Sequence, residues 1–448
     1  MVDSLDTMWI MGLHEEFNAS MHAVANLTFA LPKFEYAPFF ETVIRYLGGL
    51  LSAYAVSKEP LFLSRAEELG QKLLPVFNTT SGLPRYAVNT VSGSTSFGWT
   101  GGAVLFAEAA TCQMEYKYLA HLTGRTEFYD KVESIMGKMY EADVPNGLFA
   151  ERWNPDRATP NDKHYSVGAA ADSGYEYFLK QYLLSGKTEV KARDQYIKSA
   201  NGIINNLVYI SPTRKLLYVT DTINGNPTHT LEHLSCFLPG LLALGVHTLG
   251  DSLTSREKQL HKWAAEGLAH TCWTTYADTQ SGLGPDGVRF TAESSLWVPY
   301  LEKWEKEGGS GGIPPGLTEP PPKAPTRDYF MSSHVYLLRP ETVETFFVMY
   351  KTSGDVKWRE RGWAVFEALE KHAKNEHGFA SVSNVDSIPT YLNDDMPSFF
   401  LAETLKYLYL LFAEKDLIPL DEWVFNTEAH PLPIFQWKDW EKKEYHIQ

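Results

Sequence analysis

The sequence is poor in three features that define large classes of protein. Its acidic residues outnumber its basic ones, 55 Asp and Glu against 40 Lys and Arg, which gives a formal net charge of -15. Nucleic acids bind to clusters of Lys and Arg, and no basic stripe occurs here, so we expect no nucleic-acid partner. No run approaches the ~20 consecutive apolar residues of a membrane-spanning helix. The sequence therefore predicts a globular protein.

Cysteine is also scarce. Only Cys112, Cys236 and Cys272 are present, which is too few for a disulfide scaffold and lacks the C-x-x-C spacing of zinc and redox sites. One disulfide bond plus one free thiol is possible. The sequence has no EF-hand loop, no H-E-x-x-H motif and no phosphate-binding glycine loop, so spacing alone indicates no metal or nucleotide.

Three N-x-S/T sequons begin at Asn18, Asn26 and Asn78. They can be glycosylated only if the chain enters the secretory lumen. Met1 leads directly into Val2-Asp3-Ser4, without the basic and apolar regions of a signal peptide.

Long amphipathic helices dominate the pattern. Apolar residues recur at i, i+3 and i+4 spacing, for example in 39–57, 101–122 and 170–184. Strand signals are sparse, and short β-hairpins fit some of the Gly-, Pro- and Asn-rich turns between helices. Helix pairs recur at roughly 50 to 60 residues, a spacing that favours a closed ring of helical hairpins.

The segment 305–328 departs from this pattern because it is rich first in Gly and then in Pro. Such a composition cannot hold a helix. Helical patterning resumes directly after it, so we interpret the segment as a surface loop within a single domain, 1–448. A linker between two domains is the alternative interpretation.

Several predicted helices carry an acid on an otherwise apolar face. Glu41 and Arg45 are four residues apart, as are Asp172 and Glu176, so each pair projects from one side of its helix. Glu108 has no such neighbour. An i,i+4 ion pair explains Glu41 and Arg45 structurally, and an N-capping Asp172 followed by a solvated Glu176 explains the second pair.

Three further acids fit the same pattern. Glu341 and Glu344 follow Pro340 in the first turn of a predicted helix, where helix capping also explains them. Glu403 has Lys406 three residues later, which supplies an ordinary ion-pair explanation.

Taken together, five helices that each direct an acid into an apolar face predict a shared polar centre, since buried acids need polar surroundings. His233 could join this centre, although a lone histidine is more often a core residue. Hydrolysis of a glycosidic bond needs such a set, with one carboxylic acid to protonate the leaving oxygen and one carboxylate to activate water or attack.

Four segments carry a resemblance to a known family: 2–13 (VDSLDTMWIMGL), 44–52 (IRYLGGLLS), 338–344 (LRPETVE) and 425–431 (FNTEAHP). In this order and spacing, the sequence resembles the class I α-mannosidases, glycoside hydrolase family 47, through nearly the whole chain. The resemblance implies an all-α fold, an (α/α)7 barrel of helical hairpins with a few short β-hairpins, one of which closes one end. It also implies an inverting exo-α-1,2-mannosidase that removes terminal α-1,2-linked mannose from high-mannose N-glycans.

The resemblance also assigns roles to residues. Glu41 matches the general acid, acting through a water, and Glu341 the general base, with Asp172 as an alternative or helper. Thr427 matches the one direct protein ligand of Ca²⁺, through its hydroxyl and carbonyl oxygens, and waters complete the shell. The residues that match the sugar pocket and the holders of those waters are Arg45, Glu108, Glu176, His233, Arg339, Glu344, Phe399, Glu403 and Glu428. Cys236 and Cys272 match a disulfide pair, and Cys112 is then a free core cysteine.

By the same resemblance, we expect a monomer in the lumen of the endoplasmic reticulum or Golgi, or a secreted one. In the family a helix, and usually a membrane anchor before it, precede the segment that matches Asp3 to Asp6. We therefore expect this sequence to be part of a longer chain. Any contact with a membrane would be made only through that anchor. Ala170 stands where members that remove one particular mannose carry Arg, which predicts broader trimming. Glu232 stands where Asp is common.

The alternative function is a lectin-like degradation factor of the same fold. Such a protein recognises mannose and cleaves it weakly or not at all.

Overall fold

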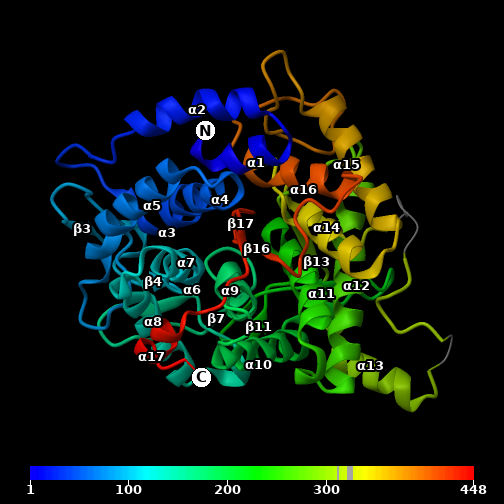
Figure 1. Ribbon diagram of the computed structural model, residues 1–448. Helices are drawn as coiled ribbons and strands as arrows, with labels where there is room; N and C mark the ends of the chain where they lie inside the picture. The colour runs from blue at the N-terminus through cyan, green and yellow to red at the C-terminus, as the bar shows by residue number, and fades with distance from the viewer. Residues whose placement is uncertain (310–311, 320–325, 448) are drawn as a thin grey trace.

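The computed structural model describes residues 1–309, 312–319 and 326–447, and Figure 1 shows their arrangement. Helices that line the centre alternate along the chain with helices that pack outside them. The inner elements are η1–α1 (Val2–Ser4, Leu5–Ile10), η2–α4 (Thr42–Leu47, Gly48–Ser57), α7 (Gln113–Thr123), α9 (Asp172–Leu184), α11 (Leu238–Thr248), α14 (Glu341–Ser353) and η8–α16 (Phe400–Thr404, Leu405–Phe412). Each contacts the next in this order, and η8 contacts η1 and α1, so the inner ring closes.

The outer helices each pack against the inner helix that precedes them in the chain. They are α2 (His14–Asn26), α5 (Pro60–Leu73), α8 (Thr126–Glu141), α10 (Val190–Asn206), α12 (Ser255–Ala277) and α15 (Lys357–His372). The seven inner elements and these six outer helices agree with the predicted (α/α)7 arrangement, of which the described residues form six inner–outer helical hairpins. No helix among the described residues is both long and apolar enough to cross a bilayer.

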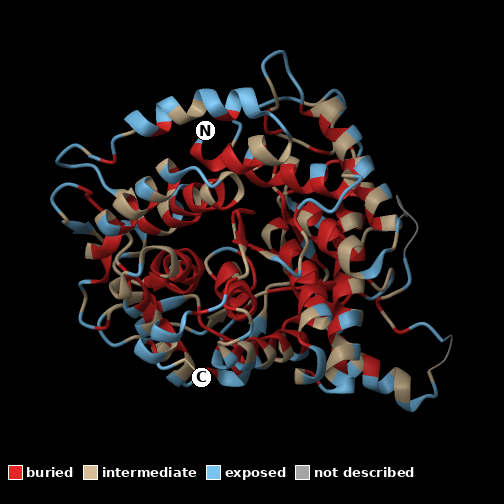
Figure 2. Cartoon of the chain, in the orientation of Figure 1, coloured by how far each residue is buried: buried red, intermediate tan, exposed pale blue. Residues whose placement is uncertain are grey.

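The two sets of helices differ in burial because they differ in sequence pattern. In α5 the buried residues Phe62, Ala66, Leu69 and Leu73 recur at spacings of three and four, so one stripe faces inward. In α9, by contrast, every residue from Ser173 to Leu184 is buried. Figure 2 shows the same contrast between the buried centre and the exposed outer faces.

Short strands and helices connect the hairpins. The remaining helices are α3 (Phe39–Glu41), α6 (Phe106–Ala110), α13 (Trp297–Lys306), α17 (Asp439–Glu444), η3 (Leu74–Phe77), η4 (Gly98–Thr100), η5 (Pro145–Gly147), η6 (His233–Phe237) and η7 (Gly250–Ser252). The described strands all pair antiparallel.

The strands form small sheets. In order, these sheets contain β1 (Ala37–Pro38), β2 (Ala87–Val88) and β3 (Thr95–Ser96); β4 (Val104–Leu105), β5 (Arg152–Asn154) and β6 (Thr159–Pro160); β11 (Asn226–Pro227), β10 (Thr222–Ile223) and β7 (His164–Tyr165); β14 (Ser295–Leu296), β8 (Val208–Ile210) and β9 (Leu217–Val219); β12 (Thr230–Glu232), β13 (Gly287–Phe290) and β15 (Tyr329–Ser333); and β16 (Trp423–Phe425) with β17 (Pro431–Pro433). The hairpin β16–β17 lies inside the ring of helices in Figure 1, where it contacts α4 and α9.

Two of the three example helices are confirmed. Residues 39–57 form α3, η2 and α4 without a break, and 170–184 contain α9. The prediction of one helix over 101–122 is wrong, because β4 and α6 occupy its first half and Thr111 ends α6 outside the helical region. Gln113 supports this break, since its side chain accepts from the amide of Cys112 and donates to the carbonyl of Ala109.

Part of the predicted loop 305–328 lies outside the described residues. Helix α13 extends to Lys306, and 312–319 and 326–328 contain no helix. The residues 310–311 and 320–325 are not described.

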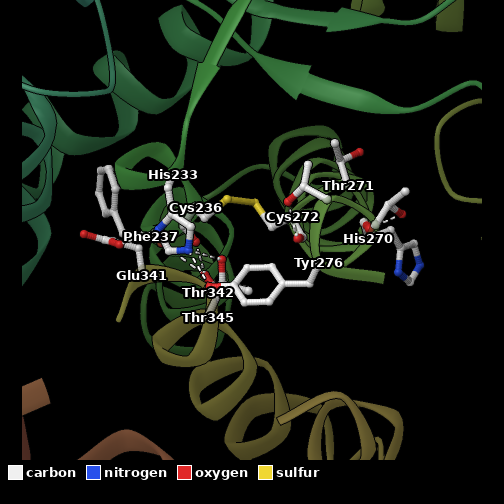
Figure 3. The surroundings of a disulfide bond; sticks show 12 residues. His233, Cys236, Phe237, His270, Thr271, Cys272, Tyr276, Glu341, Thr342 and Thr345 are labelled. Carbon is white, nitrogen blue, oxygen red and sulfur yellow. Dashed lines mark hydrogen bonds and ion pairs between the residues drawn. A yellow bond between two sulfur atoms is a disulfide. The ribbon is translucent and has the colours of Figure 1, made fainter. Parts of the chain in front are cut away.

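The predicted disulfide is confirmed. Cys236 and Cys272 are bonded, and Cys112 is a buried free cysteine. The bond joins η6, the turn directly before the inner helix α11, to the outer helix α12, as Figure 3 shows. It closes a loop between residues 36 positions apart.

Removal of this bond is expected to destabilise the fold. For a loop of this length the chain-entropy estimate is about 3 to 4 kcal/mol, because the unfolded chain gains freedom. Urea unfolding of the Cys236→Ala/Cys272→Ala variant without reductant measures this loss, and Cys112→Ala is the control that removes a buried thiol and no cross-link. Equal loss in both variants would contradict the prediction.

Candidate active site

A cavity of 340 Å³ lies within the inner ring, a size typical of small-ligand pockets. Almost all of the predicted site residues line it, although they come from distant parts of the chain. The predicted residues that line it are Glu41, Arg45, Glu108, Asp172, Glu176, Arg339, Glu341, Glu344, Phe399, Glu403, Thr427 and Glu428. His233 is the exception, since it is buried behind the wall and reaches the cavity through Glu341.

Glu341 is the first residue of α14, and it forms a hydrogen bond with His233, which is buried behind the cavity wall. One ring nitrogen of His233, Nδ1, lies 2.7 Å from Oε2 of Glu341. Burial alone would raise the pKa of Glu341, but the hydrogen bond that it accepts from His233 and the charge of Arg339 lower it below its usual value. Glu341 is therefore an anion at neutral pH.

Asp172 is the first residue of α9, not its N-cap, which is Ala171. Burial raises the pKa of Asp172 to about 7, with the charges of Glu176, Glu341 and Glu232 acting in the same direction. Two carboxyl groups in one cavity thus differ in pKa, because of the two only Glu341 has cationic and hydrogen-bonding partners that outweigh desolvation.

The loop before Asp172 forms part of the cavity wall. Ala169 donates its amide to Oε2 of Glu232 at 2.8 Å, and Ala170 adopts a left-handed conformation with φ of 72°. The short side chains of Ala169 and Ala170 both line the cavity. An Arg at position 170 would therefore project from this wall.

Glu41 and Arg45 form the predicted i,i+4 ion pair, at 2.7 Å. The Glu41 side chain remains 49% exposed, so solvent can reach it. Arg45 also pairs with Glu428 and lies 3.6 Å from Asp3, so a single guanidinium compensates three acids.

Phe399 and Glu108 complete the wall. The guanidinium groups of Arg45 and Arg339 lie 5.7 and 5.9 Å from the centre of the Phe399 ring, so two cations contact this ring. Burial raises the pKa of Glu108 to about 7, and the charge of Glu41 adds to this effect.

Thr427 lies in the turn between β16 and β17, surrounded by acids. Burial raises the pKa of Glu344 to about 8, and the pKa values of Glu403 and Glu428 are also raised, by burial and by neighbouring carboxylates. Glu176 is buried and paired with Lys180, so the alternative of a solvated Glu176 is wrong.

This donor set can be tested against the predicted calcium. Among the described residues, no group of three His, Cys, Asp or Glu side chains could hold a metal directly. A cation bound to Thr427 and to waters needs no such group, and the surrounding acids would hold those waters. A divalent cation would also offset the repulsion that raises the pKa values of Glu344, Glu403 and Glu428. The residues therefore fit a hard cation.

A buried ion cluster beneath this turn was not predicted as part of the site. Asp6 lies within hydrogen-bonding distance of Lys406 at 3.1 Å, His430 at 2.8 Å and Ser52 at 2.9 Å. The other ring nitrogen of His430 lies 3.1 Å from Asp3. Lys406 thus pairs with Asp6. The sequence-based interpretation of Lys406 as the partner of Glu403 is therefore wrong.

The same cluster fixes the turn itself. Lys406 donates to the carbonyl of Ala429 at 2.6 Å. Asn426 accepts from the amides of Glu428 and His430 and donates to the buried carboxyl of Glu115 at 2.8 Å. The position of Thr427 therefore depends on α1, α7 and α16. Spacing could not reveal the contacts that anchor the turn, because Lys406 is 400 positions from Asp6 and Asn426 is 311 positions from Glu115.

Residues 1–434 match the family described as glycosyl hydrolase family 47. The chain is 37% identical over 436 residues to mannosyl-oligosaccharide alpha-1,2-mannosidase IA of Drosophila melanogaster, covering 97% of this chain and 60% of that protein. It is 38% identical over 438 residues to human mannosyl-oligosaccharide 1,2-alpha-mannosidase IB, covering 97% and 62%. The chain thus spans about three fifths of the length of these relatives.

A solved structure is also similar. The alpha-1,2-mannosidase from Trichoderma reesei superposes with a TM-score of 0.84 and 27% sequence identity, covering 97% of this chain and 90% of that one. This similarity extends over both rings of helices.

Lys406 is expected to be essential to the stability of the buried cluster. Its side chain is fully buried, and Lys406→Met leaves Asp6 with one cationic partner fewer. Loss of one partner of a buried pair costs about 3 to 5 kcal/mol. Chemical denaturation tests this, with Lys374→Met as the control, because the exposed pair of Lys374 with Glu370 contributes about 1 kcal/mol or less. A similar small loss in both variants would show that the cluster contributes little.

Proposed function

The chain belongs to glycosyl hydrolase family 47, and on that premise we propose that it is an inverting exo-α-1,2-mannosidase. Its substrate is the terminal α-1,2-linked mannose of high-mannose N-glycans on glycoproteins. The observation that carries this proposal is the difference between two carboxyl groups in one cavity. Glu341 has a lowered pKa, whereas that of Asp172 is about 7. Environments that separate the pKa values of neighbouring acids are typical of acid–base catalysis.

We assign the general base to Glu341. A base must be deprotonated at the working pH, and hydrogen bonding to His233 favours the anion of Glu341. Asp172 retains its proton to higher pH, which supports Glu341 over Asp172 as the base. Asp172 is then a helper that lines the same wall.

Glu41 is proposed as the general acid, acting through a water. Its side chain lines the cavity and is half exposed, so a water can lie between it and the leaving oxygen. In an inverting reaction the base deprotonates an attacking water on the opposite face of the sugar, and the two carboxyl groups are ~6.5 to 9.5 Å apart.

The remaining cavity residues are proposed to bind the sugar. Phe399 lines the cavity beside Arg45 and Arg339, and its aromatic ring offers an apolar surface to one face of the sugar ring. Glu108, Glu176, Glu344, Glu403 and Glu428 can accept hydrogen bonds from sugar hydroxyls or from the waters around a cation. When bound at Thr427, Ca²⁺ would orient the sugar through two of its hydroxyls.

We also propose where the protein acts and how many mannose residues it removes. A disulfide bond is typical of the secretory lumen, which supports the endoplasmic reticulum or Golgi, or secretion. The small side chain of Ala170 supports trimming of several mannose residues, because no long side chain projects from this position into the cavity.

Glu341→Gln is expected to reduce mannose release by about 10² to 10⁴-fold, because the amide cannot take a proton from water. The measurement is release of mannose from a purified nine-mannose glycan, with the anomer of the first product identified by NMR. Glu305→Gln, which alters an exposed ion pair, is the control. Full activity in Glu341→Gln would contradict the assignment of the base.

The lectin-like alternative makes a different prediction for Glu41→Gln. A hydrolase loses turnover and keeps its affinity for the glycan, whereas a lectin is hardly changed. Failure of the folded, calcium-loaded wild-type protein to release mannose would favour the lectin.

Thr427→Ala is expected to abolish stabilisation by calcium. Calcium at 100 times its dissociation constant should stabilise the wild-type protein by about 2.7 kcal/mol. Thermal unfolding with Ca²⁺ and with chelator measures this difference, and Thr352→Ala, at a partly buried position near the end of α14 and outside the cavity wall, is the control. An equal calcium-dependent shift in Thr427→Ala would place the cation elsewhere.

A further inference from the structure

A chain of hydrogen bonds extends from Glu341 away from the cavity. His233 Nδ1 lies 2.7 Å from Glu341, and its Nε2 lies 2.6 Å from the hydroxyl of Tyr276 and 3.3 Å from Oγ1 of Thr342. Figure 3 shows these side chains converging from η6, α12 and α14. Tyr276 is fully buried and does not line the cavity, so it cannot touch a bound sugar.

The chemistry of Glu341 sets the proton positions in this chain. A carboxylate only accepts hydrogen bonds, so Nδ1 of His233 carries the hydrogen and donates to Oε2 of Glu341. In the neutral ring Nε2 is then an acceptor. The hydroxyl of Tyr276 keeps its proton because burial raises its pKa well above the usual value, so it donates to Nε2.

We propose that Tyr276 is a positioning residue for Glu341, acting through His233. By donating to Nε2, Tyr276 fixes the tautomer of His233 that carries hydrogen on Nδ1. That hydrogen holds Oε2 of Glu341 and leaves Oε1 for the attacking water. This inference rests on the proposed role of Glu341 as the base.

During hydrolysis of the glycosidic bond, His233 holds Glu341 while Glu341 acts as the base. Oε1 of Glu341 takes a proton from water, the water oxygen bonds to the anomeric carbon, and the glycosidic bond breaks as its oxygen receives a proton from the acid. His233 keeps its proton throughout. Without the donor from Tyr276, His233 can adopt the other tautomer and present a lone pair to Glu341. That arrangement disfavours the anion, so Glu341 would hold a proton more tightly.

The backbone reinforces this geometry. Cys236 lies three residues after His233 and Cys272 four residues before Tyr276, and the disulfide joins them. Thr345, one turn after Glu341, donates its hydroxyl to the carbonyl of Cys236 at 2.6 Å. The three elements that carry the hydrogen-bond chain are thus linked to one another beside it.

Several other charged groups lie near Glu341. Arg339 lowers its pKa, whereas Asp172, Glu344 and Glu403 interact with it as neighbouring acids. Tyr336 also lies close, behind Tyr276. Tyr276→Phe leaves the arginine and the three acids unchanged and retains the buried ring, and it removes only the hydroxyl, which also interacts with Thr342 and Tyr336.

Tyr276→Phe is expected to lower kcat about tenfold and to move the acidic limb of kcat/KM to higher pH by about one unit, the change that one hydrogen bond allows. Mannose release from the nine-mannose glycan is measured as a function of pH. Tyr196→Phe is the control, because its buried hydroxyl bonds to Leu241 away from the cavity. An unshifted limb in Tyr276→Phe, with or without lower activity, would overturn the proposal, since a purely structural role changes rate without moving the limb.

A second measurement does not depend on activity. In protein labelled with ¹⁵N-histidine, NMR distinguishes the two tautomers of His233, and His233→Gln identifies its signals. The hydrogen is expected on Nδ1 in the wild-type protein and on Nε2, or on both nitrogens, in Tyr276→Phe. Hydrogen on Nε2 alone in the wild-type protein would overturn the proposal even if the chain hydrolyses no glycan, so failure of the proposed function is distinguished from failure of this inference.

Discussion

The burial of carboxylates inside a ring of apolar helices is the constraint on which the rest of the structure depends. An isolated buried charge is costly unless it is paired or hydrogen-bonded. Asp6 satisfies this requirement with Lys406, His430 and Ser52. The same Lys406 then holds the carbonyl of Ala429 in the β16–β17 turn. Charge compensation at the centre of the ring therefore also places the residues that face the cavity.

Much of the fold and of the candidate site was predictable from the sequence, for two different reasons. Apolar residues recur with a period of 3.6 in 39–57 and 170–184, because one face of such a helix, or the whole helix, is buried. The structure has helices in both segments. The acids Glu41, Asp172, Glu341 and Glu403 stand out because each interrupts an apolar face, and all four line one cavity. The disulfide and the role of Thr427 came only from the family resemblance, and only the disulfide is confirmed by the structure.

The rest was not predictable because it depends on contacts between distant residues. Lys406 looked like the partner of Glu403 at i+3, but Asp6, which is 400 residues away in sequence, is its partner. The helix predicted over 101–122 breaks at Thr111 because Leu105 pairs with Arg152 in a neighbouring strand and Thr111 bonds to Ser173. Local periodicity contains no information about such tertiary partners.

Two separate supports meet at the cavity. Residues of α1, α7 and α16 hold the β16–β17 turn. Glu341 is held instead by residues of η6 and α12, through His233. The first support combines the buried ions around Asp6 with the amide hydrogen bonds of Asn426, and it holds the turn that carries Thr427. The second is a chain of hydrogen bonds that ends on the carboxylate of Glu341 and lowers its pKa. The two supports use different side chains, but they remain coupled by charge, because Glu344 and Glu403 interact with Glu341 across the cavity. A cation that offsets the charge of these acids would therefore also change the basicity of Glu341.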